Sequence, residues 1–151
     1  MKFTVYLAGE IHTDWREELK DKAKALDLPL EFVGPMTDHE RSDNIGELVL
    51  GAQANSIAKD EAASQINNLR TQLLMKKSDV VIALFGEKYK QWNTAMDASA
   101  AISLQKPLIL IRPENLHHPL KELSNKANVT VETVNQALKV LTYVLEQEAG
   151  R

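Results

Sequence analysis

The stretch Asp79 to Phe85, with the sequence DVVIALF, decides the fold class of this chain. It is an almost continuous apolar run that stops at Gly86. Such runs are typical of a central parallel strand whose two faces are both covered by helices. Shorter apolar runs lie before and after it, most of them ending at glycine or proline, and are predicted as further strands. They are Phe3 to Ala8, Leu30 to Val33, Leu108 to Ile111 and Asn128 to Val131.

Apolar residues at helical spacing separate these strands. They predict helices from about Asp14 to Leu26, Lys59 to Lys77, Thr94 to Gln105 and Glu132 to Glu148. At the start of the first helix, Asp14 and Glu17 match a capping box. In the second helix the expected buried stripe is Ile66, Leu69, Leu73 and Leu74.

The stretch from Met36 to about Ser56 is polar and weakly periodic. It predicts a long loop of the functional or mobile kind, with a short helix from Ile45 to Leu50 left open. The alternation of strands and helices elsewhere predicts one α/β domain over residues 1–151, with a flavodoxin-like, doubly wound, five-stranded parallel sheet. Ligands of such folds bind beyond the carboxyl ends of the strands.

Composition excludes several classes of protein. The 151 residues are 44% hydrophobic and 26% charged, which is too apolar for a disordered chain. Cysteine is absent, so disulfide scaffolds, thiolate metal sites and cysteine nucleophiles are excluded. A net charge of -3 argues against a nucleic-acid polymer as partner. No apolar run approaches the roughly 20 residues of a membrane span, and MKFTVYLAGE is typical of a first strand rather than a signal peptide. We therefore expect a cytoplasmic protein with no membrane partner.

Motifs for cofactors are also missing from the sequence. There is no G-x-G-x-x-G after the first strand and no P-loop. The four histidines, His12, His39, His117 and His118, have no partner at helical metal-ligand spacing. We expect neither a cofactor nor a metal.

Asp97 is the first candidate for chemistry. If Asn93 or Thr94 caps the helix that follows the central strand, Asp97 lies in the first turn beside the ligand cleft. It is then either a nucleophile or base aimed at a ligand, or an acidic residue favoured by the helix dipole. Trp92 and Tyr89 precede it, and either stack on a planar ligand or pack under the loop or at a subunit interface.

Two other strand ends offer candidates. Gly9 allows a ligand to approach the backbone closely at the end of the first strand, whereas Tyr6 by itself is typical of a core residue. Arg112 ends a buried strand, where it suits a phosphate or carboxylate; the alternative is a surface salt bridge.

Three pieces of the chain, VYLAG, SDVVIALFG and NTAMDASAAISLQKPLILI, resemble the nucleoside 2-deoxyribosyltransferases. More closely, VYLAGEIHTDWREE, FVGPMTDHERSDNIGE, ALFGEKYKQWNTAMDAS and RPENLHHPLKELSNKAN resemble the bacterial YtoQ family of deoxyribosyltransferase-like proteins. The resemblance implies attack of a carboxylate on the anomeric carbon of a nucleoside, release of the base, and capture of the glycosyl-enzyme by another base or by water.

The resemblance also implies residue roles. Asp97 falls at the nucleophilic Glu of the family, Tyr6 at the Tyr that orients this carboxylate, and Asn93-Thr94 at the Gly-Thr pair of the sugar site. Gln91 and Thr71 stand where many members carry carboxylates that contact the base. The remaining substrate-binding candidates are Gly9, Glu10, His12, Asp43, Asn44, Gly86, Trp92 and Arg112.

Three function classes follow, of which the third is an interaction scaffold whose Tyr89–Trp92 loop is a dimer contact. The first is an enzyme acting on the N-glycosidic bond of a nucleoside or nucleotide, a transferase or hydrolase with Asp97 as nucleophile and Glu10 or Asp43 as acid/base. The second is a non-catalytic nucleotide-binding module, favoured by the missing base-reading carboxylates. By resemblance we expect a small-molecule nucleoside or nucleotide as partner, and a homo-oligomer.

Overall fold

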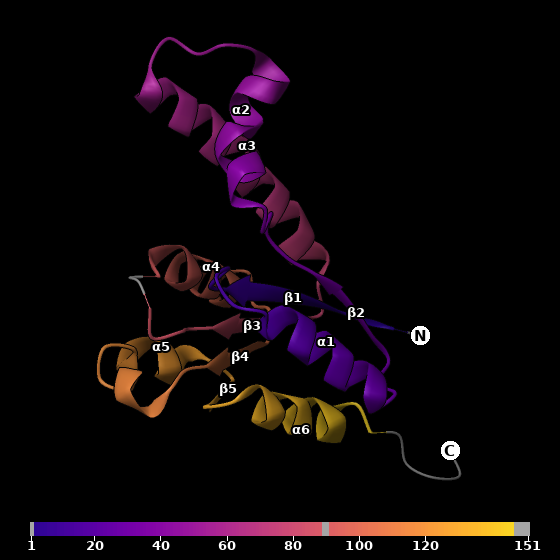
Figure 1. The fold of residues 1–151 in the computed structure, drawn as a ribbon. Helices are drawn as coiled ribbons and strands as arrows, with labels where there is room; N and C mark the ends of the chain where they lie inside the picture. Colours follow the sequence, from indigo (N-terminus) through magenta and orange to yellow (C-terminus); the bar gives the residue numbers. More distant parts are fainter. Residues whose placement is uncertain (1, 89–90, 147–151) are drawn as a thin grey trace.

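The computed structural model describes residues 2–88 and 91–146. Its centre is a five-stranded, all-parallel sheet in the order β2-β1-β3-β4-β5 (Figure 1). The strands are β1 (Phe3–Gly9), β2 (Leu30–Val33), β3 (Val80–Leu84), β4 (Leu108–Ile111) and β5 (Val129–Val131). This strand order is that of flavodoxin-like folds, so the predicted fold class is confirmed, with strand boundaries within one residue of expectation.

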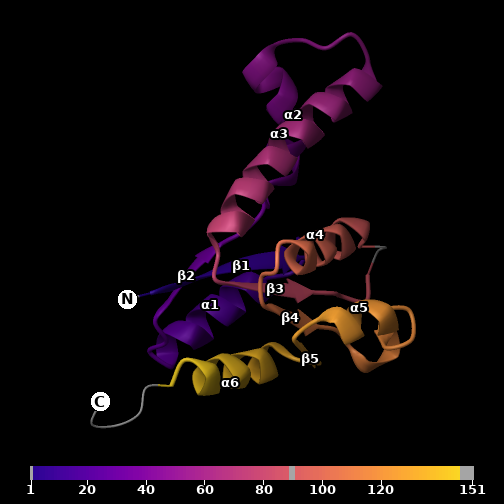
Figure 2. The ribbon, with the colours of Figure 1, turned by 180° about the vertical axis from the view of Figure 1, so that it is seen from behind.

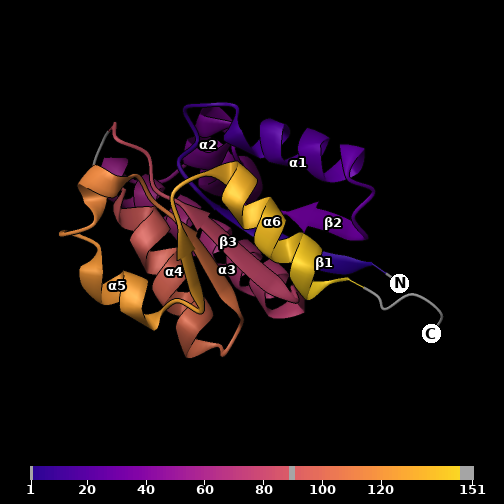
Figure 3. The same ribbon diagram turned by 90° about the horizontal axis from the view of Figure 1, so that it is seen from below.

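The DVVIALF stretch forms β3, between β1 and β4. Its alternating side chains enter two separate cores, which is why the run is apolar throughout. Ile82 joins Val5 and Leu7 under α1 (Trp15–Ala25) and α6 (Val134–Val144). Figure 3 shows these two helices side by side over one face of the sheet. Val81 and Ala83 join Tyr6 on the other face.

That second face is covered by the carboxyl-terminal part of α3 (Ser56–Lys77), by α4 (Trp92–Ser103) and by α5 (Lys121–Lys126). A short 3-10 helix, Glu114–Leu116, precedes α5. Neither of these two short helices was predicted, because each is less than two turns long and has little apolar periodicity. In the described chain, no helix is both long and apolar enough to cross a membrane.

The prediction of a long loop from Met36 to Ser56 is wrong. Most of this stretch is α2 (His39–Leu50), which begins at Asp38, whose side chain accepts a hydrogen bond from the Arg41 amide at 3.1 Å. α2 packs against α3, and this α2–α3 hairpin stands away from the sheet (Figures 1 and 2). The packing is close at Gly46: a Cβ there would lie 2.7 Å from the Ala62 Cβ.

The projection of the hairpin overturns half of the predicted stripe of α3. Ile66 and Leu74 are partly buried, whereas Leu69 and Leu73 are more than half exposed, and the residues that α3 buries fully are Ala62, Ala63 and Met75. Helical spacing identifies the helix but not its partner. The amino-terminal part of α3 packs on α2 through alanines rather than on the sheet through leucines.

Two predicted helix caps are also wrong. Asp14 precedes α1 but its side chain makes no capping hydrogen bond. α4 begins at Trp92, two residues earlier than expected, with Gln91 at the N-cap position and no side-chain cap. Asp97 therefore lies in the second turn of α4 rather than in the first turn as predicted.

Candidate active site

The candidate site lies where the strand order reverses, between β1 and β3. Tyr6 projects from β1 into the sheet–α4 core and is completely buried. Its hydroxyl donates a long hydrogen bond, 3.4 Å, to Thr71 Oγ1 on α3. Asp97 on α4 is close enough for its charge to affect the Tyr6 pKa. Residues far apart in sequence, on β1, α3 and α4, thus meet near the switch in strand order, where ligands of such sheets bind.

Burial dominates the electrostatics of this pair. It raises the pKa of Asp97 from 3.8 to about 6, against an opposing effect of the Arg16 charge. It likewise raises the pKa of Tyr6 from 10.0 to about 12; the Asp97 charge adds to this, and Thr71, Arg70 and Arg16 oppose it. At neutral pH the carboxylate is therefore ionised but carries a raised pKa, whereas the phenol stays protonated and can donate.

The Asp97 carboxylate is not used for structure. Among the described residues it accepts no hydrogen bond and forms no ion pair within 4.0 Å, and the side chain is only partly buried. A carboxylate so placed is energetically unfavourable unless a ligand uses it. This favours the first interpretation of Asp97, a group aimed at a ligand, over an acidic residue retained for the helix dipole.

Arg16, on α1, is a site residue that the sequence reading missed. It is 8% exposed, and its guanidinium donates to the carbonyls of Leu7, Gly9 and Glu10 at 2.7 to 3.3 Å. It also lies over the Trp15 ring, 4.7 Å from the centroid. Burial lowers the pKa of Arg16, while Tyr6, Glu10 and Asp97 raise it. The signal was present: an arginine in the first turn of the helix after the first strand points back at that strand's carboxyl end.

The loop after β1 contains Gly9, Glu10 and His12. Gly9 has φ +145, and a Cβ there would lie 2.7 Å from the Leu84 oxygen and 2.8 Å from the Trp15 ring. What approaches this glycine is therefore the protein itself. The Glu10 carboxylate accepts hydrogen bonds from the amides of His12, at 2.6 Å, and Thr13, at 3.1 Å, and from the Thr13 hydroxyl. It holds the turn into α1.

The loop after β3 is closed by Gln91. Its side chain accepts from the Gly86 amide at 3.1 Å and donates to the carbonyls of Gly86, at 2.9 Å, and Lys88, at 3.0 Å. Gly86 also faces Glu10, since a Cβ there would lie 3.3 Å from the Glu10 Cγ. The loops after β1 and β3 are thus in contact, as a shared cleft requires. Tyr89 lies outside the described residues.

The start of α4 holds three further candidates. Thr94 is buried, whereas Asn93 and Trp92 are exposed, Trp92 by 74%. Stacking on a ligand and packing at a subunit interface both stay open for Trp92.

The other candidates lie on different elements. Asp43 and Asn44 are on α2 in the hairpin: Asp43 lies 3.3 Å from the His39 ring, and the Asn44 amide donates to the Glu40 carbonyl at 2.7 Å. Arg112 follows β4 at the same sheet edge as Gly9 and Gly86. Its guanidinium lies 3.4 Å from His117 Nδ1 and 3.9 Å from the Glu132 carboxylate, and its buried Nε has no hydrogen-bond partner among the residues that the structure describes.

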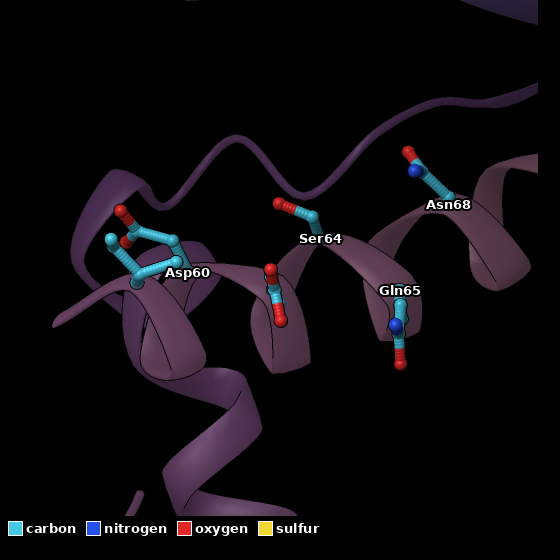
Figure 4. Close-up of a pocket in the computed structure, with 6 residues that line it drawn as sticks. Asp60, Ser64, Gln65 and Asn68 are labelled. Atoms are coloured by element: carbon cyan, nitrogen blue, oxygen red, sulfur yellow. The ribbon is translucent and has the colours of Figure 1, made fainter. Parts of the chain in front are cut away.

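Two hollows lie near these elements. One is an open depression along the outer face of α3, lined by Asp60, Ser64, Gln65 and Asn68 among others (Figure 4). It belongs to a single helix, so no second element converges on it. The other, which we call the basic cavity, has a volume of about 320 Å³. It is lined by Leu7, Arg16, Glu17, Lys20, Phe32, Val33, Gly34, Pro35, Thr37, Arg70 and Leu74. No group of three or more acidic or histidine side chains suited to a metal occurs in residues 2–88 and 91–146.

Solved structures define the class of fold. A 2-deoxyribosyltransferase from the psychrotolerant bacterium Bacillus psychrosaccharolyticus has a TM-score of 0.59 and 18% identity, over 91% of this chain and 95% of that chain. A conserved protein from Enterococcus faecalis V583 has a TM-score of 0.61 and 15% identity, over 96% of this chain and all of that one. The chain therefore has the fold of a 2-deoxyribosyltransferase.

Sequence similarity then defines the family. Residues 6–145 match the family described as nucleoside 2-deoxyribosyltransferase YtoQ. A relative from Bacillus subtilis (strain 168), called Uncharacterized protein YtoQ, is 70% identical over 148 residues, covering 98% of this chain and 100% of that protein. The chain belongs to the YtoQ family, and the resemblance drawn from its motifs is confirmed.

Proposed function

We propose that this protein is an enzyme acting on the N-glycosidic bond of a nucleoside or nucleotide, with Asp97 as nucleophile. The observation that carries the proposal is the partly buried Asp97 carboxylate, whose pKa is raised to about 6 and which has no structural partner in the described chain. A carboxylate of this kind is ionised at neutral pH but weakly solvated, which favours attack on an electron-poor carbon.

In the proposed reaction an Asp97 oxygen forms a bond to the anomeric carbon as the bond from that carbon to the base nitrogen breaks. The electron pair leaves with the base, which takes up a proton from solvent; in the second step the incoming acceptor returns a proton to solvent. Before the new bond is complete, the negative carboxylate stabilises the oxocarbenium-like transition state. A second base or a water molecule then displaces Asp97 and regenerates the free carboxylate. These two acceptors correspond to transferase and hydrolase.

Tyr6 is the proposed orienting residue. Its raised pKa of about 12 keeps the phenol a donor at neutral pH, next to a carboxylate that needs one. Its hydroxyl bonds to Thr71 at 3.4 Å, long enough for the bond to be exchanged for one to Asp97 or to a sugar hydroxyl when a ligand is bound.

The aspartate is shorter than the glutamate of related enzymes by one methylene. The sugar must then bind one bond length closer to α4. The proposed sugar contacts are Thr94, which is buried in the first turn of α4, Asn93 beside it, and Gly86 in the loop before the helix, with Trp92 against the base. Such an enzyme meets nucleosides in the cytoplasm, which is the location that we propose.

Base release tests the proposal. Wild type, Asp97→Ala and Asp97→Glu are incubated with ribo- and deoxynucleosides and their 5′-monophosphates, with and without a second free base, and the products are separated by chromatography. We expect release or exchange by wild type, a loss of roughly three orders of magnitude in Asp97→Ala, and partial retention in Asp97→Glu. Asp21→Ala, on the exposed face of α1, is the matched control and should turn over as wild type. Normal turnover in a folded Asp97→Ala variant excludes the mechanism.

A second candidate function is a non-catalytic nucleotide-binding module. It is favoured by two positions where related enzymes carry carboxylates that contact the base. Here these positions are Thr71, which accepts a hydrogen bond from Tyr6, and Gln91, whose amide donates to carbonyls of its own loop. This function predicts nucleotide binding with no base release from any member of the panel.

We also propose that the protein forms a homo-oligomer. The α2–α3 hairpin exposes Leu48, Leu50 and Ile57 together with Leu69 and Leu73, and such apolar surface is usually covered by a partner. Light scattering coupled to size-exclusion chromatography tests this directly, and a monomer at micromolar concentration contradicts it.

A further inference from the structure

We propose that the basic cavity is a binding site for a phosphate monoester. The cavity lies beside the Tyr6–Asp97 site, at the carboxyl end of β2, between α1 and α3. The inference rests on the proposed function only in taking a nucleoside as the carrier of the phosphate.

The charges that line the cavity carry the inference. Arg16 and Lys20 come from α1 and Arg70 from α3, and Glu17 is the one acidic residue among the lining side chains. Glu17 lies 3.4 Å from Lys20 in a pair whose side chains are 40% and 70% exposed, so this ion pair is weak and easily exchanged.

The two guanidinium groups are not neutralised at close range. Within the described chain, neither Arg16 nor Arg70 has a carboxylate within 4.0 Å, although Glu10 and Asp97 attract Arg16 over a longer distance. Two guanidinium groups that line one cavity repel each other, although the chain as a whole has a net charge of -3. An anion in the cavity removes that repulsion.

Arg16 and Arg70 have different parts in such a site. Arg16 has committed most of its N–H groups to the carbonyls at the end of β1, so it supplies a fixed charge. Within the described residues Arg70 makes one hydrogen bond, from Nη1 to the carbonyl of Gly34 at 2.6 Å, and Gly34 also lines the cavity. Four of its five N–H groups remain, enough for two parallel hydrogen bonds to a phosphate.

The size and lining of the cavity indicate an ester rather than a free ion. A volume of about 320 Å³ is at the lower end of the range for small-molecule sites and exceeds what a phosphate group fills. Apart from Gly34 and Thr37, its remaining walls are apolar and suit the carbon skeleton that carries the phosphate; they are formed by Leu7, Phe32, Val33, Pro35 and Leu74. Two guanidinium groups and an ammonium match the double negative charge of a monoester better than the single charge of a carboxylate.

Calorimetric titration tests the site in the Asp97→Asn background, where turnover cannot obscure binding. The ligands are 2′-deoxynucleoside 5′-monophosphates, the matching nucleosides, and inorganic phosphate as competitor. We expect the monophosphates to bind more tightly than the nucleosides and phosphate to displace them. Arg70→Gln should weaken monophosphate binding by on the order of tenfold and leave nucleoside binding within about twofold. Lys20→Gln should have a smaller effect in the same direction.

Arg41→Gln, an exposed arginine on α2 outside the cavity, is the matched control, and circular dichroism establishes that each variant folds. The inference is overturned if nucleosides bind as tightly as monophosphates, if Arg70→Gln weakens both equally, or if Arg41→Gln has the same effect as Arg70→Gln. Failure of the proposed function is a separate outcome: phosphate-selective binding without base release by wild type refutes the enzyme and retains the site. Base release from nucleosides, with no tighter binding of the monophosphates, supports the enzyme and refutes the phosphate site.

Discussion

Replacing Asp97 with asparagine should make the folded chain more stable above about pH 6, although it removes the proposed nucleophile. The reason is the environment of the carboxyl group, because burial raises its pKa from 3.8 to about 6. Below about pH 4 the carboxyl is protonated in the folded and unfolded chains and costs nothing. Between these two values the unfolded chain loses its proton first, so wild-type stability falls as the pH rises. Above about pH 6 the carboxyl is ionised in both states, and the stability of wild type falls no further from this cause.

The size of the effect follows from the interval between the two pKa values. A tenfold change in proton affinity corresponds to about 1.4 kcal/mol, so the interval corresponds to about 3 kcal/mol. Asparagine has the same shape and does not titrate. The free energy of unfolding of Asp97→Asn, minus that of wild type, should therefore rise by about 3 kcal/mol between pH 4 and pH 6 and then stay level.

Urea unfolding at a series of pH values from about 4 to about 8 measures this difference. Asp21→Asn, an exposed carboxylate on α1, is the control, and any pH dependence common to both variants reflects net charge and is subtracted. A difference that is flat with pH, or that favours wild type as the pH rises, refutes the reasoning. A flat difference would mean that attraction by Arg16 balances the effect of burial at Asp97. A difference that favours wild type would mean that the attraction is larger and that folding stabilises the carboxylate.

Further predictions concern backbone packing and the Arg16 charge. Gly9→Ala should cost at least about 2 kcal/mol more in urea unfolding than Gly51→Ala, because both have positive φ but only Gly9 meets other atoms within 4 Å; equal losses would contradict the packing argument. Gly46→Ala should separate α2 from α3 and speed amide hydrogen exchange in both helices, and unchanged exchange would count against their close contact. Arg16→Met should raise the pKa of Asp97 further, moving the acid limb of a pH–activity profile to higher pH; a shift to lower pH would be incompatible with an attractive Arg16.

The sheet was predictable because its information is local. DVVIALF is apolar at every position since both faces of β3 are covered, and that pattern survives in the sequence itself. The same is true of β1 and β4. Asp97 was singled out by its position after the central strand and Tyr6 only by resemblance to a family, and the structure brings their elements together at the switch in strand order.

The hairpin was not predictable in the same way. Leucines at helical spacing in α3 suggested a buried stripe, yet Leu69 and Leu73 are exposed and α3 buries Ala62 and Ala63 against α2. Periodicity indicates which residues share a face but not what that face meets. α2 itself was obscured because a polar helix on a projecting arm has little apolar pattern to detect.

By itself, the sequence determined the fold class, the strands and the carboxylate on which the proposed chemistry depends, because each is recorded in the identity and spacing of neighbouring residues. Only the tertiary structure decided the environment of that carboxylate. Burial raises the pKa of Asp97, and the Arg16 charge opposes that effect. Arg16 and Arg70 line one cavity. All three features arise where α1, α3 and α4 come together. Burial and Coulomb interactions depend on distance in space, and no pattern along the chain specifies it.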